Sequence, residues 1–150
     1  EVPIAYQYSS IIESSKAREA YFLVYAADIK AALRIPVMVT GGFRSRAVMN
    51  QAIASGATDL IGIGRPFIID PVFPSKLLSG EIDAAPAVER TFPPEDDLPR
   101  GTVLNWFCHQ LAVQGESGSA DPSVPLLEGH ERYLLRTGVL SKKMLDARKF

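Results

Sequence analysis

Two turns rich in glycine are the places in this sequence where residue types and spacing point to chemistry. Gly41 and Gly42 follow one apolar run, and Gly62, Gly64 and Arg65 close a second apolar run further along the chain. A turn without side chains lets backbone N–H groups approach an anion, and a helix that follows it adds the positive end of its dipole. An arginine beside such a turn can bind two phosphate oxygens at once. These residues predict binding of a phosphate group.

Each turn taken alone has a plainer explanation. A single glycine pair is expected wherever a tight turn needs a positive φ angle, whether or not a ligand is bound. The second turn changes this interpretation because it lies one strand-helix unit downstream, and the carboxyl ends of neighbouring parallel strands meet at the same edge of a sheet. In (β/α)8 barrels, the loops after the seventh and eighth strands form a phosphate site together. The pair of turns therefore favours a phosphate site without specifying the cofactor.

Alternating strands and helices are predicted to position the two turns. The apolar segments 36–40 and 59–64 predict short strands that are buried on both faces, as parallel strands are. A helix over 46–54 is predicted between them, with Ser45 as its N-cap and Gly56 just after its end. Strands that alternate with helices indicate a β-α-β unit and a parallel sheet.

Further helices are predicted on both sides of this unit. The preceding helix begins at Ser14 or Ser15 and ends near Leu33, because Pro36 disfavours helix just before it. The apolar face of this helix is formed by Phe22, Ala26, Ile29 and Leu33. A short helix over 70–79, capped by an aspartate and with proline at its first position, follows the second strand.

The chain changes character after residue 80. Prolines and acidic residues over 81–100 predict a linker with little regular structure. The segment 101–114 returns to a helical pattern, and its apolar face is formed by Leu104, Phe107, Cys108 and Leu111. The predicted organisation is a β-α-β region over 1–80, a linker over 81–100 and a helical tail over 101–150.

Composition excludes several classes of function. The chain has 150 residues, 47% apolar and 22% charged, and its formal net charge of −1 gives no electrostatic footprint for nucleic acid or an anionic membrane. Cys108 is the single cysteine, so neither an internal disulfide nor a cysteine-based metal site is expected. No apolar run approaches the ~18 residues of a membrane span, and no signal peptide is recognised. A cytoplasmic location is expected.

The region around the two turns resembles a known enzyme family. The stretch from residue 36 to residue 71 reads PVMVTGGFRSRAVMNQAIASGATDLIGIGRPFIIDP. It is similar to the last two strand-helix units of the Old Yellow Enzyme family, the FMN-dependent NADH:flavin oxidoreductases and ene-reductases. Residues 14–33 resemble the helix before the seventh strand, and LNWFCHQL at 104–111 resembles the family's C-terminal tail. The fold implied by the resemblance is α/β, the C-terminal portion of a (β/α)8 TIM barrel with strands seven and eight, plus a helical tail.

The resemblance also implies cofactor contacts, taken position by position. In that family the two loops bind the FMN phosphate. Gly41 belongs to the first loop. In the same loop, Gly42 and Phe43 would offer backbone N–H groups to the phosphate. Gly62 and Gly64 would frame the second loop, and Arg65 would contact the phosphate and the flavin side. Phe67 occupies the position at which the family often has an aromatic or apolar residue near the flavin edge.

Other parts of the family's machinery find no counterpart in this sequence. The residues that hold the substrate carbonyl and the tyrosine that donates a proton belong to earlier parts of the barrel, so no catalytic residue and no metal ligand is assigned. His109 and His130 are interpreted as ordinary surface or partly buried residues. Arg44 and Arg46 are candidates to supplement the phosphate site, but the favoured interpretation is that they are solvated residues at a helix start. The five tyrosines and Cys108 are better explained by packing.

Two functions follow from these observations. The first is an FMN-dependent oxidoreductase of the ene-reductase type, in which NAD(P)H reduces the flavin and an electrophilic alkene or similar acceptor is reduced in turn. This chain would be its phosphate-anchoring part, inactive alone, and the missing barrel portion would be its partner. The alternative is a truncated, non-catalytic remnant that binds a phosphate or a partner chain. Dihydroorotate dehydrogenase-like and inosine-phosphate dehydrogenase-like barrels are further alternatives, and Gly-Arg-Pro-Phe favours the ene-reductase group over them.

Overall fold

The computed structural model describes residue 20 and residues 22–147, and these residues form two compact units. The first unit runs to Phe67 and resumes over Val72–Pro86, and the second comprises Ile68–Pro71 and the chain from Ala87 onward. Each unit is described by itself. The helix start predicted at Ser14 or Ser15 lies outside the described residues.

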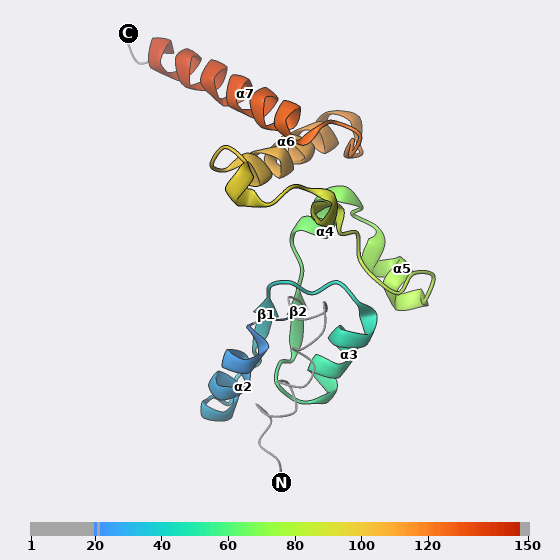
Figure 1. Ribbon diagram of the computed structural model, residues 1–150. Helices are drawn as coiled ribbons and strands as arrows, with labels where there is room; N and C mark the ends of the chain where they lie inside the picture. Colours follow the sequence, from blue (N-terminus) through green and yellow to red (C-terminus); the bar gives the residue numbers. More distant parts are fainter. Residues whose placement is uncertain (1–19, 21, 148–150) are drawn as a thin grey trace. The chain divides into compact units, whose positions relative to one another are not determined.

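A pair of parallel strands forms the centre of the first unit (Figure 1). Strand β1 spans Met38–Thr40 and strand β2 spans Leu60–Gly62, with Val39 opposite Ile61. The predicted parallel pairing is therefore confirmed, although both strands are shorter than the segments predicted from the sequence. Helix α3, Arg46–Ala54, connects them and agrees with its predicted bounds.

Three further helices belong wholly or partly to this unit. Helix α2 spans Leu23–Ala32 and lies beside β1, whereas α3 lies beside β2 (Figure 1). Helix α4, Arg65–Ile69, begins directly after the second turn, and helix α5 spans Phe73–Ser79. The single helix predicted over 70–79 is therefore wrong at its start. Proline is tolerated in a first helical turn, so Pro66 and Pro74 fit two separate helix starts.

The core of the first unit lies on one side of the strands. It contains Leu23 and Ala26 from α2, Val39 from β1, and Met49 and Ala52 from α3, together with Phe43, Ala57 and Leu77. Met38 and Leu60 are 61% and 56% exposed, so the prediction of strands buried on both faces is wrong for the described chain. Two strands cannot cover both of their own faces, since that requires further layers.

The apolar face predicted for the first helix is also wrong in part. Ala26 is buried as expected, but Phe22, Ile29 and Leu33 are 47%, 50% and 45% exposed. The buried face includes Leu23 instead, which lies three residues before Ala26.

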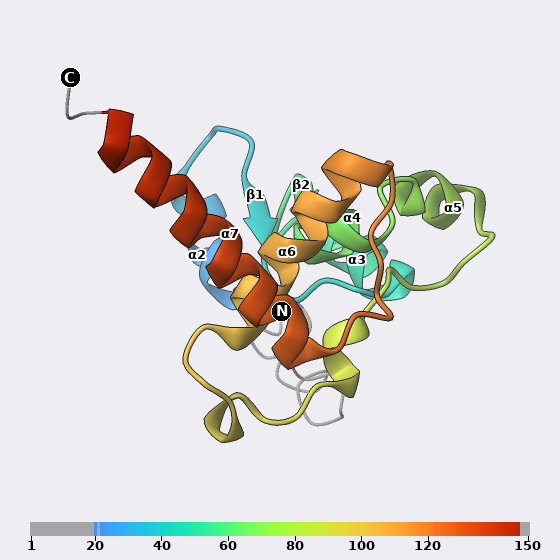
Figure 2. The ribbon, with the colours of Figure 1, turned by 90° about the horizontal axis from the view of Figure 1, so that it is seen from above.

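Two helices dominate the second unit. Helix α6 spans Thr102–Ser117 and helix α7 spans Leu126–Ala147, and they lie side by side in both Figure 1 and Figure 2. The proline-rich segment before them contains two one-turn 3-10 helices, η1 over Val88–Thr91 and η2 over Glu95–Asp97.

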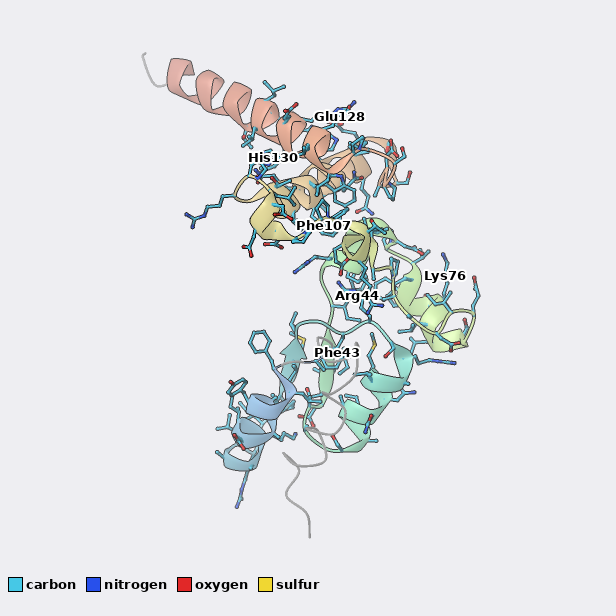
Figure 3. The ribbon with its side chains drawn as sticks, in the orientation of Figure 1. Phe43, Arg44, Lys76, Phe107, Glu128 and His130 are labelled. Carbon is cyan, nitrogen blue, oxygen red and sulfur yellow. The ribbon has the colours of Figure 1, made fainter. Side chains whose placement is uncertain are left out.

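Aromatic rings fill the core of the second unit. The rings of Trp106 and Phe107 meet edge to face at 5.1 Å, and Phe92 packs on Trp106 at 5.1 Å. The indole N–H of Trp106 donates to the carbonyl of Val124 at 2.9 Å. Leu104 and Leu111 are 67% and 54% exposed, so of the apolar face predicted for this helix only Phe107 is buried (Figure 3).

No helix among the described residues is both long and apolar enough to cross a membrane. Within that same part of the chain, no group of three or more potential metal-binding side chains is present.

Candidate phosphate-binding site

The strand register brings the two glycine turns to the same edge of the sheet. Thr40 lies opposite Gly62 in the parallel pair. The turn that contains Gly41 and Gly42 follows Thr40 directly, and Gly64 lies two residues after Gly62. Both turns therefore begin at the carboxyl ends of adjacent strands, which is the arrangement that a shared phosphate site requires.

Three of the four glycines are needed by the fold itself. Gly41 and Gly42 have φ angles of 143° and 72°, which side chains with a Cβ atom rarely adopt. Gly62 has an ordinary φ angle, but a Cβ atom there would overlap with the hydroxyl group of Thr40 on the neighbouring strand. These glycines are explained by backbone conformation and close packing.

Gly64 differs from the other three. Its φ angle lies outside the left-handed region, and no described atom lies within 4 Å of the place where a Cβ would stand. The residue is exposed. Neither conformation nor packing of the described chain therefore requires glycine at this position.

Phe43 anchors the first turn in the core. Its side chain is only 1% exposed and belongs to the same core as Met49 and Leu77 (Figure 3). Within the described residues, the backbone N–H groups of Gly42 and Phe43 donate to no other backbone group. The buried ring thus fixes the main chain of the turn, and the N–H groups of Gly42 and Phe43 remain available to donate to a ligand.

Arg65 and Phe67 are the first and third residues of α4, directly after the second turn. Arg65 is exposed, and the next residue, Pro66, is buried. The ring of Phe67 is 42% exposed and contacts the buried ring of Phe73 edge to face at 4.9 Å. Arg65 therefore presents a cation at the turn, and Phe67 presents one side of an aromatic ring to solvent.

The arginines at the start of α3 are held by the protein. Arg44 donates from Nη1 to the carbonyl of Phe43 at 2.7 Å. Arg46 forms an ion pair with Asp83, with Nη2 and Oδ1 2.7 Å apart. The interpretation as a solvated residue is therefore wrong for Arg44, which is half-buried, whereas the side chain of Arg46 is 39% exposed and pairs at the surface. Ser45 is the N-cap residue of α3, as predicted, but it makes no side-chain capping hydrogen bond.

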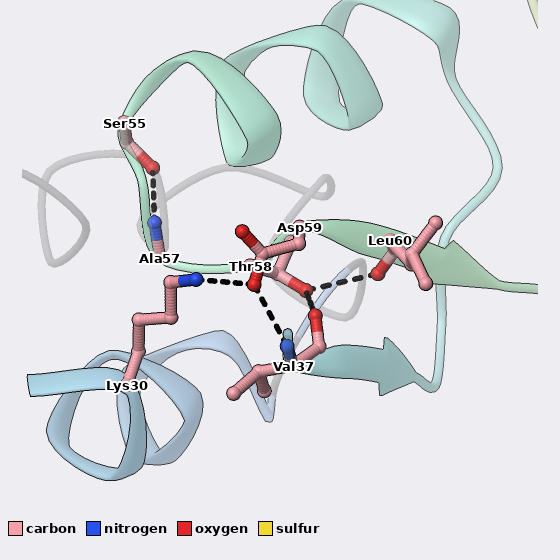
Figure 4. A network of polar contacts seen from close by, with 7 residues as sticks. All are labelled: Lys30, Val37, Ser55, Ala57, Thr58, Asp59 and Leu60. Carbon is pink, nitrogen blue, oxygen red and sulfur yellow. Dashed lines mark hydrogen bonds and ion pairs between the residues drawn. The ribbon is translucent and has the colours of Figure 1, made fainter. Parts of the chain in front are cut away.

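The opposite ends of the strands carry a polar network that the sequence reasoning missed (Figure 4). The carboxylate of Asp59 accepts hydrogen bonds from Nζ of Lys30 and, at 2.7 Å, from the backbone N–H of Val37. These two donors lower the pKa of Asp59. The buried hydroxyl of Thr58 donates to the carbonyl of Val37 at 2.9 Å. An aspartate at the first position of an otherwise apolar predicted strand was the one available signal.

Both histidines lie in the second unit and are buried there. The sequence predicts ordinary surface or partly buried residues, but His109 is 7% exposed and His130 is 9% exposed, so both are more deeply buried than predicted. Nδ1 of His130, which Figure 3 labels, is 3.1 Å from Nδ2 of Asn105, at hydrogen-bonding distance. Burial lowers the pKa of His109, and the charges of Arg132 and Arg136 lower it further. Neither residue belongs to the unit that carries the glycine turns.

Comparison with known proteins gives the chain a family. The model of the NADH:flavin oxidoreductase / NADH oxidase family matches residues 7–83, a segment that includes both glycine turns. The chain belongs to this family. The resemblance to Old Yellow Enzymes is thereby confirmed, although the family match ends before α6, so the similarity of the tail to the family stays a prediction. The fold of this family is a TIM barrel, and its members are described as NADH:flavin oxidoreductases and NADH oxidases.

Individual flavin oxidoreductases are similar to parts of the chain. The NADH-dependent flavin oxidoreductase iliE of Neonectria sp. is 31% identical over 114 residues, which cover 72% of this chain and 14% of that protein. The NADH oxidase of Thermoanaerobacter brockii is 31% identical over 71 residues, covering 47% of this chain and 11% of that protein. The cinnamate reductase of Clostridium sporogenes is 29% identical over 66 residues, covering 44% of this chain and 10% of that protein.

The chain therefore matches only 10% to 14% of the length of these three similar proteins. No solved structure matches it significantly.

Proposed function

We propose that this chain forms the FMN phosphate anchor of an NAD(P)H-dependent flavin oxidoreductase of the ene-reductase type. The two turns would correspond to the loops after strands seven and eight of the barrel. Support comes from the register of Thr40 with Gly62, which brings both turns to the carboxyl edge of a parallel pair. That edge is where barrels of this class bind phosphate.

The observation that carries the proposal is the unexplained glycine at position 64. Because no described atom crowds its Cβ position and its φ angle is ordinary, the described fold gives no reason for a glycine there. Close approach of a ligand to the backbone is a standard reason for glycine in a turn. The exposed position beside Arg65 fits a phosphate group, which needs both close N–H donors and a cation.

Each residue of the site has a proposed role. In the first turn, Gly41 and Gly42 allow the tight bend, and Gly42 and Phe43 offer their N–H groups. In the second turn, Gly64 leaves room for the phosphate and Arg65 binds its oxygens. Phe67 would lie near the edge of the flavin. The residues present therefore fit the phosphate end of the cofactor.

FMN, when bound, supplies hydride transfer from NAD(P)H to an electron-poor alkene or similar acceptor. The contribution of this chain is to bind and orient the phosphate end. The acceptor class agrees with the name of one similar protein, the cinnamate reductase of Clostridium sporogenes. Names of other similar proteins refer to NADH, which favours NADH among the two reductants.

The remaining strands of the barrel are the proposed partner of the first unit. Ile35, Met38 and Leu60 are apolar and 61%, 61% and 56% exposed at or beside the two strands. Tyr25 on α2 is 67% exposed. Neighbouring strand-helix units of a barrel would cover such surfaces and pair the open strand edges.

A direct test compares FMN with riboflavin, which lacks the phosphate. The chain is titrated into micromolar FMN or riboflavin, and quenching of flavin fluorescence is measured. We expect the affinity for FMN to exceed that for riboflavin by about tenfold or more, because hydrogen bonds to a charged group contribute roughly 1.5–3 kcal/mol each. Equal affinities, or no binding of FMN, would contradict the proposal.

Arg65→Ala separates the phosphate from the rest of the cofactor. We expect it to weaken FMN binding about tenfold, since it removes a charge-assisted hydrogen bond, and to leave riboflavin binding as it was. Arg34→Ala is the matched control, because this exposed arginine precedes the amino end of β1, whereas both turns follow the carboxyl ends of the strands.

The alternative is a non-catalytic remnant that binds a phosphate or a partner chain. It is favoured by the lack of an assigned proton donor or substrate-binding residue in this chain. The two functions differ in one measurable respect: oxidation of NAD(P)H by the chain with FMN, lost on Arg65→Ala, would exclude the remnant.

A further inference from the structure

The chain that follows α5 runs back along the start of α3. Ala84 pairs with Ser45 in an isolated antiparallel bridge. The N–H of Ala85 donates to the carbonyl of Arg44 at 2.8 Å, and the N–H of Arg46 donates to the carbonyl of Asp83 at 2.8 Å. We refer to residues 83–85 as the strap. Ala85 is 4% exposed, so the strap ends in the core.

The side chain of Arg46 is committed to the same contact. Its guanidinium pairs with the carboxylate of Asp83 at 2.7 Å. It also passes Gly80, where a Cβ atom would stand only 2.9 Å from Nη1 of Arg46. Gly80 has a φ angle of 81° and ends α5 in the left-handed conformation. The end of α5, the strap and the start of α3 are thus joined through one arginine.

The strap fixes one end of the first glycine turn. On one side the turn continues from β1, which is paired with β2. On the other side Arg44 and Arg46 are tied to the strap by main-chain hydrogen bonds. Between these points the ring of Phe43 is buried. The N–H groups of Gly42 and Phe43 are therefore held on a segment of main chain that is fixed at both ends and in the middle.

We propose that the strap is a positioning element for the phosphate-binding turn and that Arg46 is its partner, not a phosphate ligand. This inference rests on the proposed function. A binding site whose donors are fixed before the ligand arrives loses less conformational freedom on binding. Without the strap contact the turn is free to move. Phosphate binding must then include the loss of conformational entropy of the turn, so the affinity falls.

Arg46→Pro tests the contact at its main-chain hydrogen bond. Arg46 is the first residue of α3, where proline is tolerated, and Ser45 already has the extended conformation that a residue before proline prefers, with φ −87° and ψ 140°. The variant removes the N–H donor to Asp83. Arg46→Gln is the matched control, because it removes the guanidinium and keeps the N–H.

The readout is the affinity of the full chain for FMN and for riboflavin. For Arg46→Pro we expect about tenfold weaker binding of FMN and unchanged binding of riboflavin. For Arg46→Gln we expect less than about threefold loss, because an exposed ion pair contributes little. If Arg46→Gln weakens FMN as strongly as Arg65→Ala does, Arg46 is a phosphate ligand and the inference is wrong.

A second variant guards against misfolding of the first. Ala85→Pro removes the other main-chain donor of the strap and is expected to give the same selective loss of FMN. Unchanged FMN binding in both proline variants would overturn the inference while leaving the proposed function in place. Equal loss of FMN and riboflavin, or unfolding of both variants by circular dichroism, would also overturn it, because the strap would then support the whole unit. A wild-type chain that binds no FMN would refute the proposed function itself.

Discussion

The glycines at the ends of β1 and β2 differ in what the protein needs from them. Gly62 lies where a side chain would overlap with Thr40, and Gly42 has a backbone conformation suited to glycine. Gly64 is subject to neither demand. Substitutions at these positions should therefore separate a loss of folding from a loss of binding.

Gly64→Ala is expected to leave stability within about 0.5 kcal/mol of wild type, since an exposed residue with an open Cβ position tolerates a methyl group. We expect it to weaken FMN binding about tenfold, since the methyl group would occupy the space of the phosphate. Urea unfolding and the FMN titration measure the two effects. Gly62→Ala is the control and is expected to lower stability by roughly 1–3 kcal/mol through overpacking. A stable Gly64→Ala protein with wild-type FMN affinity would remove the main support for the proposed function.

At the scale of elements, the two ends of the strand pair serve different purposes. The carboxyl ends carry the glycine turns, and the amino ends carry the network of Lys30, Val37, Thr58 and Asp59 (Figure 4). Parallel barrels commonly separate binding from stability in this way. The network at the amino ends should therefore affect stability alone.

The pH dependence of stability should report on Asp59. Its pKa is lowered in the folded chain by the hydrogen bonds from Lys30 and Val37. The unfolded chain therefore binds a proton at higher pH than the folded one, and the stability from these contacts is present above about pH 4 and lost below it. Urea unfolding at pH 6 and pH 3 should show a smaller difference for Asp59→Asn than for wild type. An identical difference in the two proteins would contradict this assignment.

The second unit should weaken at mildly acidic pH because of His109. Burial and the charges of Arg132 and Arg136 lower its pKa, and Glu116 and Glu128 only partly oppose them. The unfolded chain takes up the proton first, so stability is complete above about pH 6.5 and falls as the pH drops below that value. Trp106 is the single tryptophan and lies in this unit, so its fluorescence reports the unfolding. His109→Gln should flatten the profile between pH 7 and pH 5, whereas an unchanged profile would exclude His109 as its source.

The sequence predicted the order of elements better than their buried faces. The bounds of α3 and the pairing of the two strands followed from apolar runs and glycine positions. On α6, the face with Leu104 and Leu111 was predicted to be buried, yet the core is built on Trp106 and Phe107. Helical spacing gives the separation of residues on one face, but the partner helix decides which face is covered.

For the candidate site, the sequence indicated the two turns but not the strap. The turns are marked by glycines after apolar runs, a local pattern. The contact of Asp83 and Ala85 with residues 44–46 joins segments that no periodicity connects, and main-chain hydrogen bonds leave no trace in residue type. The contact between the strap and residues 44–46 therefore could not be predicted from the sequence.

At the scale of the whole molecule, the first unit leaves apolar side chains exposed along an open pair of strands. Exposed Ile35, Met38 and Leu60 lie at or beside strands whose outer edges are unpaired in the described chain. Open edges and apolar patches promote association. The parent barrel would cover them.

The isolated chain is therefore expected to associate as its concentration rises. Sedimentation velocity between about 5 and 200 μM should show a growing average mass, because apolar burial favours self-association at exposed patches. Leu60→Lys should reduce the association, since a charged residue on an edge strand opposes pairing. Leu78→Lys is the control, an equally apolar residue on α5 that is 86% exposed. A monomer at every concentration would contradict the expectation.

The parallel register of the two strands also bears on how quickly the chain folds. Val37 and Asp59 are separated by 22 residues, and their hydrogen bond joins the chain just before β1 to the chain just before β2, which closes the segment that contains β1 and α3. Closing a loop of this length costs little entropy compared with pairing distant strands, and folding rates rise as contacts become more local. Both glycine turns are thus brought together by a single short-range closure. If the two turns bind phosphate as proposed, the contacts that bring them together span only one strand-helix unit of the chain.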